Sequence, residues 1–134
     1  MNRKDQHADL ANAFHTTGPN DFDLLRLVHN GFPEMALADT DLTCHLLGTQ
    51  LSAPFFINAM TGGSQKTKEI NQKLAEVAQA TNLMMATGSV SAALKDPTVS
   101  DSFTLVRKIY PDGFLLANVG ADTPLEKAKK AIDL

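Results

Sequence analysis

Six residues at the ends of three apolar runs have the types that a planar cofactor would need. Such a cofactor is bound by small residues that allow close approach, by hydrogen-bonding side chains at its edge and by an apolar contact on its face. The residues that meet these needs are Ala59, Met60, Thr61, Gly88, Ser89 and Asn118. The sequence therefore predicts a cofactor site at the run ends, although the same residues could instead do no more than form tight turns.

A second candidate group lies at the start of the chain, where Arg3, Lys4 and His7 fall close together. No other dense positive group occurs before residue 60. Because paired N–H donors allow an arginine to bind a diphosphate, this segment could be an arm that folds over an anionic substrate. A solvated chain end would have the same composition. Both interpretations remain open on the residues alone.

Motifs for other chemistries are weak or missing. The sequence has neither a GxGxxG nor a Walker A loop, although the backbone amides of Gly62 and Gly63 could receive a phosphate before a capped helix. Cys44 has no evident neighbouring base, so we expect a structural cysteine rather than a nucleophile. The remaining histidines lack metal-site spacing, and we expect surface or packing roles for His15, His29 and His45.

The three apolar runs cover residues 54–60, 83–88 and 113–118, and their nearly continuous apolar character is typical of buried parallel strands. A helical pattern follows each run. We expect Ser64 to cap the first helix, and Asp96 with Pro97 to begin the helix after the second run. The residues expected on the buried faces of these two helices are Ile70, Leu74, Val77, Ala78, Val99, Phe103 and Val106.

A third helix is expected after the last run. Thr123 and Glu126 have the spacing of a capping box, with Thr123 as the cap and Pro124 as the first helical residue. The residues expected on its buried face are Leu125, Ala128 and Ile132. The predicted order is therefore strand, helix, strand, helix, strand, helix.

This order indicates an α/β fold with a parallel sheet. Met60 and Ser89 are 29 positions apart, as are Ser89 and Asn118, and a (β/α)8 TIM barrel averages about 31 residues per unit. A doubly wound sheet has similar units. We expect one domain over residues 1–134 that forms the amino-terminal portion of a TIM barrel. It would comprise an arm and lead-in at 1–40, a hairpin turning at Gly48 within 41–53, and the first βα units at 54–134.

Composition excludes several classes of protein. The 134 residues are 43% hydrophobic and 20% charged, which is typical of a globular chain. The net charge is −3 without long runs of one sign, so neither a nucleic-acid partner nor a membrane surface is expected. One cysteine cannot form an intrachain disulfide, and the polar first residues lack a signal-peptide core. We therefore expect a cytoplasmic protein.

Several segments together resemble a known family. They are R-K-x-x-H at residues 3–7, L-V-H-N-G-F-P-E at 27–34, L-S-A-P at 51–54, N-A-M-T-G-G at 58–63, E-I-N at 69–71, G-S at 88–89, A-A-L at 92–94 and L-A-N at 116–118. M-T-G-G after a strand, combined with R-K-x-x-H at the start, is the specific part. The sequence resembles the type 2 isopentenyl-diphosphate isomerases, flavoenzymes of isoprenoid synthesis, along essentially the whole chain.

The resemblance implies an FMN-dependent (β/α)8 barrel that interconverts isopentenyl and dimethylallyl diphosphate, with reduced FMN as the acid–base group. It implies NADPH as the reductant, Mg2+ as an aid to the diphosphate, and a homo-oligomer. The FMN contacts it implies are Ala59, Met60, Thr61, Ser89 and Asn118. The diphosphate contacts it implies are Arg3, Lys4 and His7. The family's catalytic glutamine and metal-binding glutamate lie further along than these 134 residues, so we expect no catalytic or metal residue here and no activity from this piece alone.

One segment departs from the family pattern. Many members have Ser-Gln-Arg where this chain has Ser89-Val90-Ser91, and Ser91 cannot supply the cationic contact of that arginine. Two other classes remain as alternatives: an FMN-dependent 2-hydroxy acid oxidase, and a non-catalytic module that binds flavin or phosphate. The oxidases share the barrel but are not expected to combine the Arg3-Lys4 arm with M-T-G-G at residues 60–63.

Overall fold

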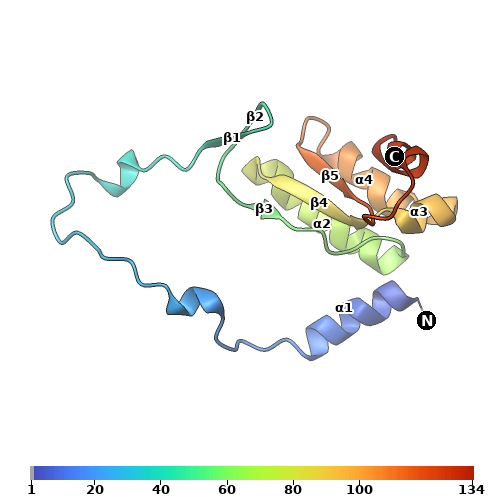
Figure 1. Cartoon of the computed structure of the whole chain (residues 1–134), viewed down its shortest axis with the longest axis horizontal. Helices are drawn as coiled ribbons and strands as arrows, with labels where there is room; N and C mark the ends of the chain where they lie inside the picture. The colour runs from blue at the N-terminus through green and yellow to red at the C-terminus, as the bar shows by residue number, and fades with distance from the viewer. Residues whose placement is uncertain (1) are drawn as a thin grey trace.

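A three-stranded parallel sheet lies at the centre of the computed structural model, which describes residues 2–134 (Figure 1). Its strands are β3 (Phe56–Ile57), β4 (Met84–Ser89) and β5 (Leu115–Asn118), in the order β3-β4-β5. Both neighbouring pairs are parallel. The structure thus confirms that the three apolar runs form adjacent parallel strands. Their predicted burial holds only for the central strand β4, whereas β3 and β5 are half-buried to exposed.

The first strand is shorter than the predicted run over residues 54–60. After Ile57 the Asn58 side chain accepts a hydrogen bond from the Ala59 amide at 2.8 Å, a local bond that replaces the regular ladder. The chain rejoins β4 beyond this point, where the Gly88 amide donates to the Thr61 carbonyl at 2.9 Å. The end of β3 is therefore an irregular segment that still lies beside β4.

Helices follow each strand, as the alternation predicts. They are α2 (Gln65–Thr81) after β3, α3 (Ser91–Lys95) and α4 (Asp101–Ile109) after β4, and α5 (Leu125–Ile132) after β5. The main core joins α2, β4 and α4 through Ala75, Ala78, Met85, Val106 and Tyr110. The chain is thus a mixed α/β structure whose core is formed between the sheet and its helices.

The buried face of α2 differs from the predicted one. Ser64 caps the helix as expected, accepting a hydrogen bond from the Thr67 amide. Only Ala78 among the predicted face residues is fully buried, while Ile70 and Leu74 are half-buried and Val77 is 51% exposed. The fully buried residues are Thr67, Asn71, Ala75 and Ala78. Apolar spacing missed this face because two of its members are polar residues that are buried with hydrogen-bond partners.

The segment before α4 forms in two steps. Asp96 accepts a hydrogen bond from the Thr98 amide and Pro97 opens a short 3-10 helix (Pro97–Val99), so the cap is confirmed. The α-helix itself begins only at Asp101. Hydrogen bonds from the Thr98 side chain and then its backbone lower the pKa of the Asp96 carboxyl. Of the predicted face, Phe103 and Val106 are buried and Val99 is half-buried.

The predicted start and buried face of α5 are wrong. Pro124 is the cap residue, with extended backbone at ψ 141, so Thr123 lies one position too early and makes no side-chain cap. The Thr123 amide instead closes a turn to the Gly120 carbonyl at 3.0 Å. Leu125 is 69% exposed, Ile132 is 80% exposed and Ala128 is half-buried. The helix packs through Ala131, which joins a second core cluster with Val90, Ala93 and Phe103.

A hairpin precedes the sheet, as predicted. Its strands β1 (Cys44–Leu46) and β2 (Thr49–Leu51) are antiparallel and turn at Leu47 and Gly48, both with positive φ. Asn82, just before β4, ties the hairpin to the amino end of the sheet: its carbonyl accepts from the Ser52 amide, and its side chain donates to the Gln50 carbonyl, both at 3.3 Å. The hairpin is therefore at the opposite end of the sheet from the predicted site.

The lead-in runs outside the sheet and its helices. Helix α1 (Arg3–Ala13) lies against the body, and residues 14–43 then form a long excursion with two short 3-10 helices, Asp21–Leu24 and Leu37–Asp39 (Figure 1). The apolar side chains of this excursion are exposed, among them Phe22, Leu27, Val28 and Phe32. None of the helices in residues 2–134 has both the length and the apolar character that a membrane crossing requires.

Candidate functional site

The predicted run ends lie side by side at the carboxyl edge of the sheet. Gly88 bonds to Thr61, Ser89 is opposite Asn118 in the β4–β5 register, and the Val90 amide donates to the Asn118 carbonyl at 2.9 Å. Gly88 permits the close approach of the two chains, because a Cβ there would come within 2.6 Å of the Thr61 carbonyl oxygen. The predicted convergence of these residues is confirmed, and their role in binding a cofactor stays a prediction.

The exposed groups at this edge are varied. Met60 is 66% exposed, Asn118 is exposed and Ala59 is half-buried, so an apolar side chain and a free amide both face outward. The Thr61 hydroxyl donates to Asn71 at 2.7 Å, and the Ser89 hydroxyl donates to the Ser91 hydroxyl at 3.0 Å. Both hydroxyls retain acceptor lone pairs. The edge can therefore offer an amide, two hydroxyl acceptors and one apolar surface to a ligand.

A buried polar network fixes the end of β3, and the sequence patterns did not identify it. Asn71 on α2 is 1% exposed, and its side-chain amide donates to the Ser102 carbonyl at 2.8 Å and to the Thr61 carbonyl at 3.2 Å. The Ser102 hydroxyl accepts from the Gly63 amide at 2.8 Å and donates to the Val99 carbonyl at 2.7 Å. Helices α2 and α4 therefore hold Thr61 and Gly63 in place from behind. The only sequence signal is that Asn71 and Ser102 lie four residues before the buried Ala75 and Val106.

The phosphate role considered for Gly62 and Gly63 is wrong in one respect. The Gly63 amide is not free, because it donates to Ser102. Two amides of the following turn are also partnered: Ser64 donates to the Thr67 hydroxyl at 2.9 Å, and Thr67 donates to the Ser64 hydroxyl at 3.1 Å. The chain's own side chains thus occupy the amides of Gly63, Ser64 and Thr67.

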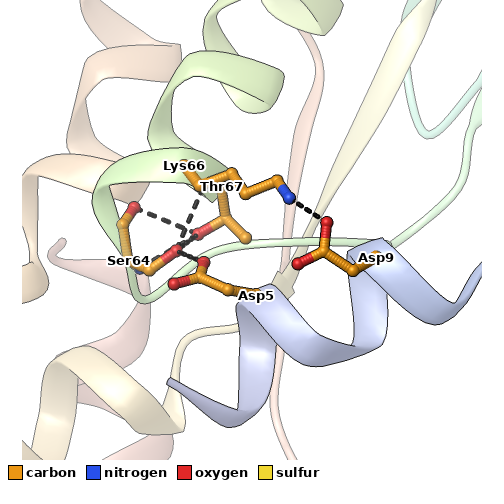
Figure 2. Close-up of polar contacts among 5 residues, drawn as sticks. All are labelled: Asp5, Asp9, Ser64, Lys66 and Thr67. Atoms are coloured by element: carbon orange, nitrogen blue, oxygen red, sulfur yellow. Dashed lines mark hydrogen bonds and ion pairs between the residues drawn. The ribbon is translucent and has the colours of Figure 1, made fainter. Parts of the chain in front are cut away.

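The amino-terminal arm docks at the same place (Figure 2). The Asn2 side chain donates to the Gly63 carbonyl at 3.0 Å, the Ser64 hydroxyl donates to Asp5, and Lys66 forms an ion pair with Asp9. Helix α1 therefore lies across the start of α2, next to the end of β3.

This docking brings two of the three predicted substrate residues to the end of β3. Lys4 and His7 line a hollow of about 360 Å3 together with Met60 and Thr61. Its remaining lining residues are Ala8, Ala11, Thr67 and Ile70. Arg3 lines a neighbouring hollow on the outer side of α1, which His7 also borders. A cation and an imidazole thus lie beside the predicted cofactor residues Met60 and Thr61. Arg3 does not line this hollow and lies on the outer side of α1.

Residues 2–134 contain no group of three or more His, Cys, Asp or Glu side chains arranged to hold a metal ion. Cys44 is a free, half-buried cysteine in the hairpin. It is at the end of the sheet opposite to the site.

Comparison with known proteins gives a consistent result. No known family model matches the chain. An isopentenyl-diphosphate delta-isomerase of Latilactobacillus sakei subsp. sakei (strain 23K) is 52% identical over 131 residues, which is 97% of this chain and 38% of the relative. The chain is similar to isopentenyl-diphosphate delta-isomerases. A protein of the same name from Staphylococcus aureus (strain JH9) is 46% identical over 132 residues, 98% of this chain and 38% of that relative.

The chain thus spans well under half the length of these relatives, while nearly all of it is matched. The relatives' name agrees with the activity that the sequence resemblance implies and leaves the flavin-dependent subtype open. The matched residues include the arm, the strand ends and the helices that hold them, because the matches cover 97–98% of the chain.

Proposed function

We propose that the protein containing this chain isomerises isopentenyl diphosphate to dimethylallyl diphosphate, and that it is the FMN-dependent, type 2 enzyme of isoprenoid biosynthesis. The observation that carries this proposal is the docking of the arm, which puts Lys4 and His7 along one hollow with Met60 and Thr61. A diphosphate needs cationic donors, and a flavin needs the mixed edge described above. The hollow between α1 and the end of β3 brings Lys4 and His7 together with Met60 and Thr61, two residues of that edge.

FMN fits the residues at the strand ends. Met60 would contact the face of the flavin ring, Ala59 would allow close approach, and Thr61, Ser89 and Asn118 would hydrogen-bond its edge. FMN in its reduced form, maintained by NADPH, would supply the acid–base group that protonates the terminal alkene carbon and removes a proton from the allylic carbon, with no net redox change. The chain's own contribution is to orient the ring. The hydrogen bonds of Asn71 to Thr61 and Ser102 keep Thr61 in a fixed position.

The arm would bind the diphosphate of the substrate. Lys4 supplies a positive charge at the hollow, His7 a ring nitrogen, and Arg3 a guanidinium from the outer side of α1. Paired N–H donors of an arginine match diphosphate oxygens well. Ser91 supplies no charge here, and its hydroxyl is bonded to Ser89, so the arm carries the cationic contacts of this chain with the diphosphate.

The wider setting belongs to the same proposal. The three βα units would be part of a (β/α)8 barrel, consistent with their parallel order and with the limited share of the relatives that the chain covers. Mg2+ would be held by residues outside this chain. We also propose a cytoplasmic homo-oligomer.

The test uses the whole protein loaded with FMN. Isopentenyl diphosphate is supplied under anaerobic conditions with NADPH, and dimethylallyl diphosphate is measured. In the same assay Lys4→Ala should raise KM for the diphosphate and leave the melting temperature nearly unchanged, because Lys4 lies on the arm at the hollow. Lys73→Ala is the matched control, since Lys73 is an exposed lysine of α2 that does not line the hollow. An unchanged KM with a lowered melting temperature in Lys4→Ala would contradict the substrate role.

A further inference from the structure

Helix α1 is held mainly by polar contacts. None of its residues is buried, and its larger apolar side chains, such as Leu10, remain exposed. A helix of 11 residues is only marginally stable on its own. The contacts that fix it are therefore the bonds from Asn2, Asp5 and Asp9 to the first turn of α2 and the glycine before it.

Two of these bonds form what we call the arm latch: Asp5 with Ser64, and Asp9 with Lys66 (Figure 2). Asp5 and Asp9 are four residues apart, so they lie on one face of α1. The residues that line the hollow at the end of β3 lie on the adjacent face and are Lys4, His7, Ala8 and Ala11. The latch therefore fixes the rotation of α1 about its axis, and with it the direction in which Lys4 and His7 are presented.

The charges of the latch are arranged to favour this orientation. The Asp5 carboxylate lies at the amino end of α2, where the helix dipole stabilises a negative charge. Lys66 is paired with Asp9, which leaves Lys4 as the cation that faces the hollow. The Asp9–Lys66 pair is exposed, so it contributes modestly and can be altered without unfolding the protein.

We propose that Asp5 and Asp9 are positioning residues that keep the arm docked before substrate binds, so that Lys4 and His7 already face the end of β3. This inference rests on the proposed function for the identity of the substrate and on the structure for the docking. Because the arm is already docked, no conformational entropy is lost in ordering it when the diphosphate binds. The latch therefore acts on substrate affinity and not on the proton-transfer step.

The first experiment measures docking directly, in the whole protein without substrate. Amide hydrogen exchange is followed in residues 3–13 for Asp9→Lys, for Lys66→Asp and for the double exchange of the two charges. Each single variant should speed exchange in α1 by about two- to fivefold, the effect expected of one exposed ion pair. The double variant should return exchange close to the original rate.

The chain offers a matched control for this experiment. Lys68 and Asp101 form a partly exposed pair at 3.4 Å that joins α2 to α4 and includes no residue of the arm. Lys68→Asp should leave exchange in residues 3–13 unchanged. Asp5→Ala tests the other half of the latch and should also speed exchange in α1, whereas Asp5→Asn should speed it less because an oxygen acceptor for Ser64 remains.

The second experiment separates positioning from a general structural role. In steady-state assays Asp9→Lys should raise KM for isopentenyl diphosphate by about two- to fivefold, leave kcat nearly unchanged, and recover in the double variant. Unchanged exchange in α1 for both Asp5→Ala and Asp9→Lys, or a fall in kcat without a rise in KM, would overturn the proposal. If exchange responds as expected but the protein does not turn over isopentenyl diphosphate, the latch stands and the proposed function fails.

Discussion

Replacing Asn71 by alanine should loosen the segment around Thr61, at the end of β3, that borders the candidate site. The Asn71 side chain joins α2, α4 and the end of β3 through three hydrogen bonds: two donated to the Ser102 and Thr61 carbonyls and one accepted from the Thr61 hydroxyl. Asn71→Ala removes all three and leaves a small void in a region that is closed to solvent. No contact with a ligand is changed directly.

The expected loss can be worked out bond by bond. The Thr61 hydroxyl is half-buried and can turn to water, and the Thr61 carbonyl keeps its bond from the Gly88 amide, so these two losses are small. The bond to the Ser102 carbonyl is buried, and its loss should cost about 0.5–1.5 kcal/mol because that carbonyl keeps its partner within α4. With the void added, Asn71→Ala should lower the free energy of unfolding by about 2–4 kcal/mol.

The assay is urea unfolding of the whole protein without FMN, followed by FMN titration of the folded variant. Gln72→Ala is the matched control: Gln72 is the next residue on α2, is exposed, and bonds only to Glu76 at 3.0 Å. It should change stability by less than about 0.5 kcal/mol. Asn71→Ala should also weaken FMN binding, because Thr61 is no longer fixed. An Asn71→Ala protein as stable as Gln72→Ala would refute the reasoning.

Three further changes test separate parts of the structure. Gly88→Ala should separate the end of β3 from β4, because its Cβ would meet the Thr61 carbonyl oxygen at 2.6 Å; we expect a loss of about 1–3 kcal/mol by urea unfolding and weaker FMN binding, and an unchanged Kd would contradict the placement of the cofactor. Gly48→Ala should destabilise the hairpin, since Gly48 has φ +82 with open space around it; thermal unfolding should show a lower Tm with the Kd for FMN unchanged. Hydrogen bonds from Thr98 lower the pKa of the Asp96 carboxyl, so the carboxylate stabilises the fold above its ordinary pKa of 3.8, and this stabilisation is lost as pH falls below that value. Asp96→Asn should therefore flatten the fall in Tm between about pH 5 and pH 3, and an unaltered acid profile would count against the Thr98 bonds as the cause.

The elements that could be predicted from the sequence are those set by residues close to one another. The strand positions follow from continuous apolar runs, and the caps at Ser64 and Asp96 from a polar residue before a helical pattern. The start of α5 shows the limit of such patterns. Thr123, Pro124 and Glu126 match a capping box, yet the extended backbone of Pro124 places the helix start one residue later.

The candidate site also has a part that could be predicted from the sequence and a part that could not. Convergence of Thr61, Ser89 and Asn118 follows from parallel strands, whose carboxyl ends share one edge. The network behind them could not be predicted, because Asn71 and Ser102 are 31 positions apart and burial of a polar side chain depends on such a partner. The docking of the arm likewise depends on Asp5 and Ser64, which are 59 positions apart.

The most direct test of the account is the dependence of isomerisation on the state of the flavin. The whole protein is freed of bound cofactor, reconstituted with FMN, and supplied with isopentenyl diphosphate and Mg2+ in two anaerobic samples, one with NADPH and one without a reductant. We predict dimethylallyl diphosphate only in the reduced sample, together with FMN binding that weakens in the Gly88→Ala protein. Equal turnover with oxidised FMN, turnover without any flavin, or oxidation of lactate in place of isomerisation would contradict the account.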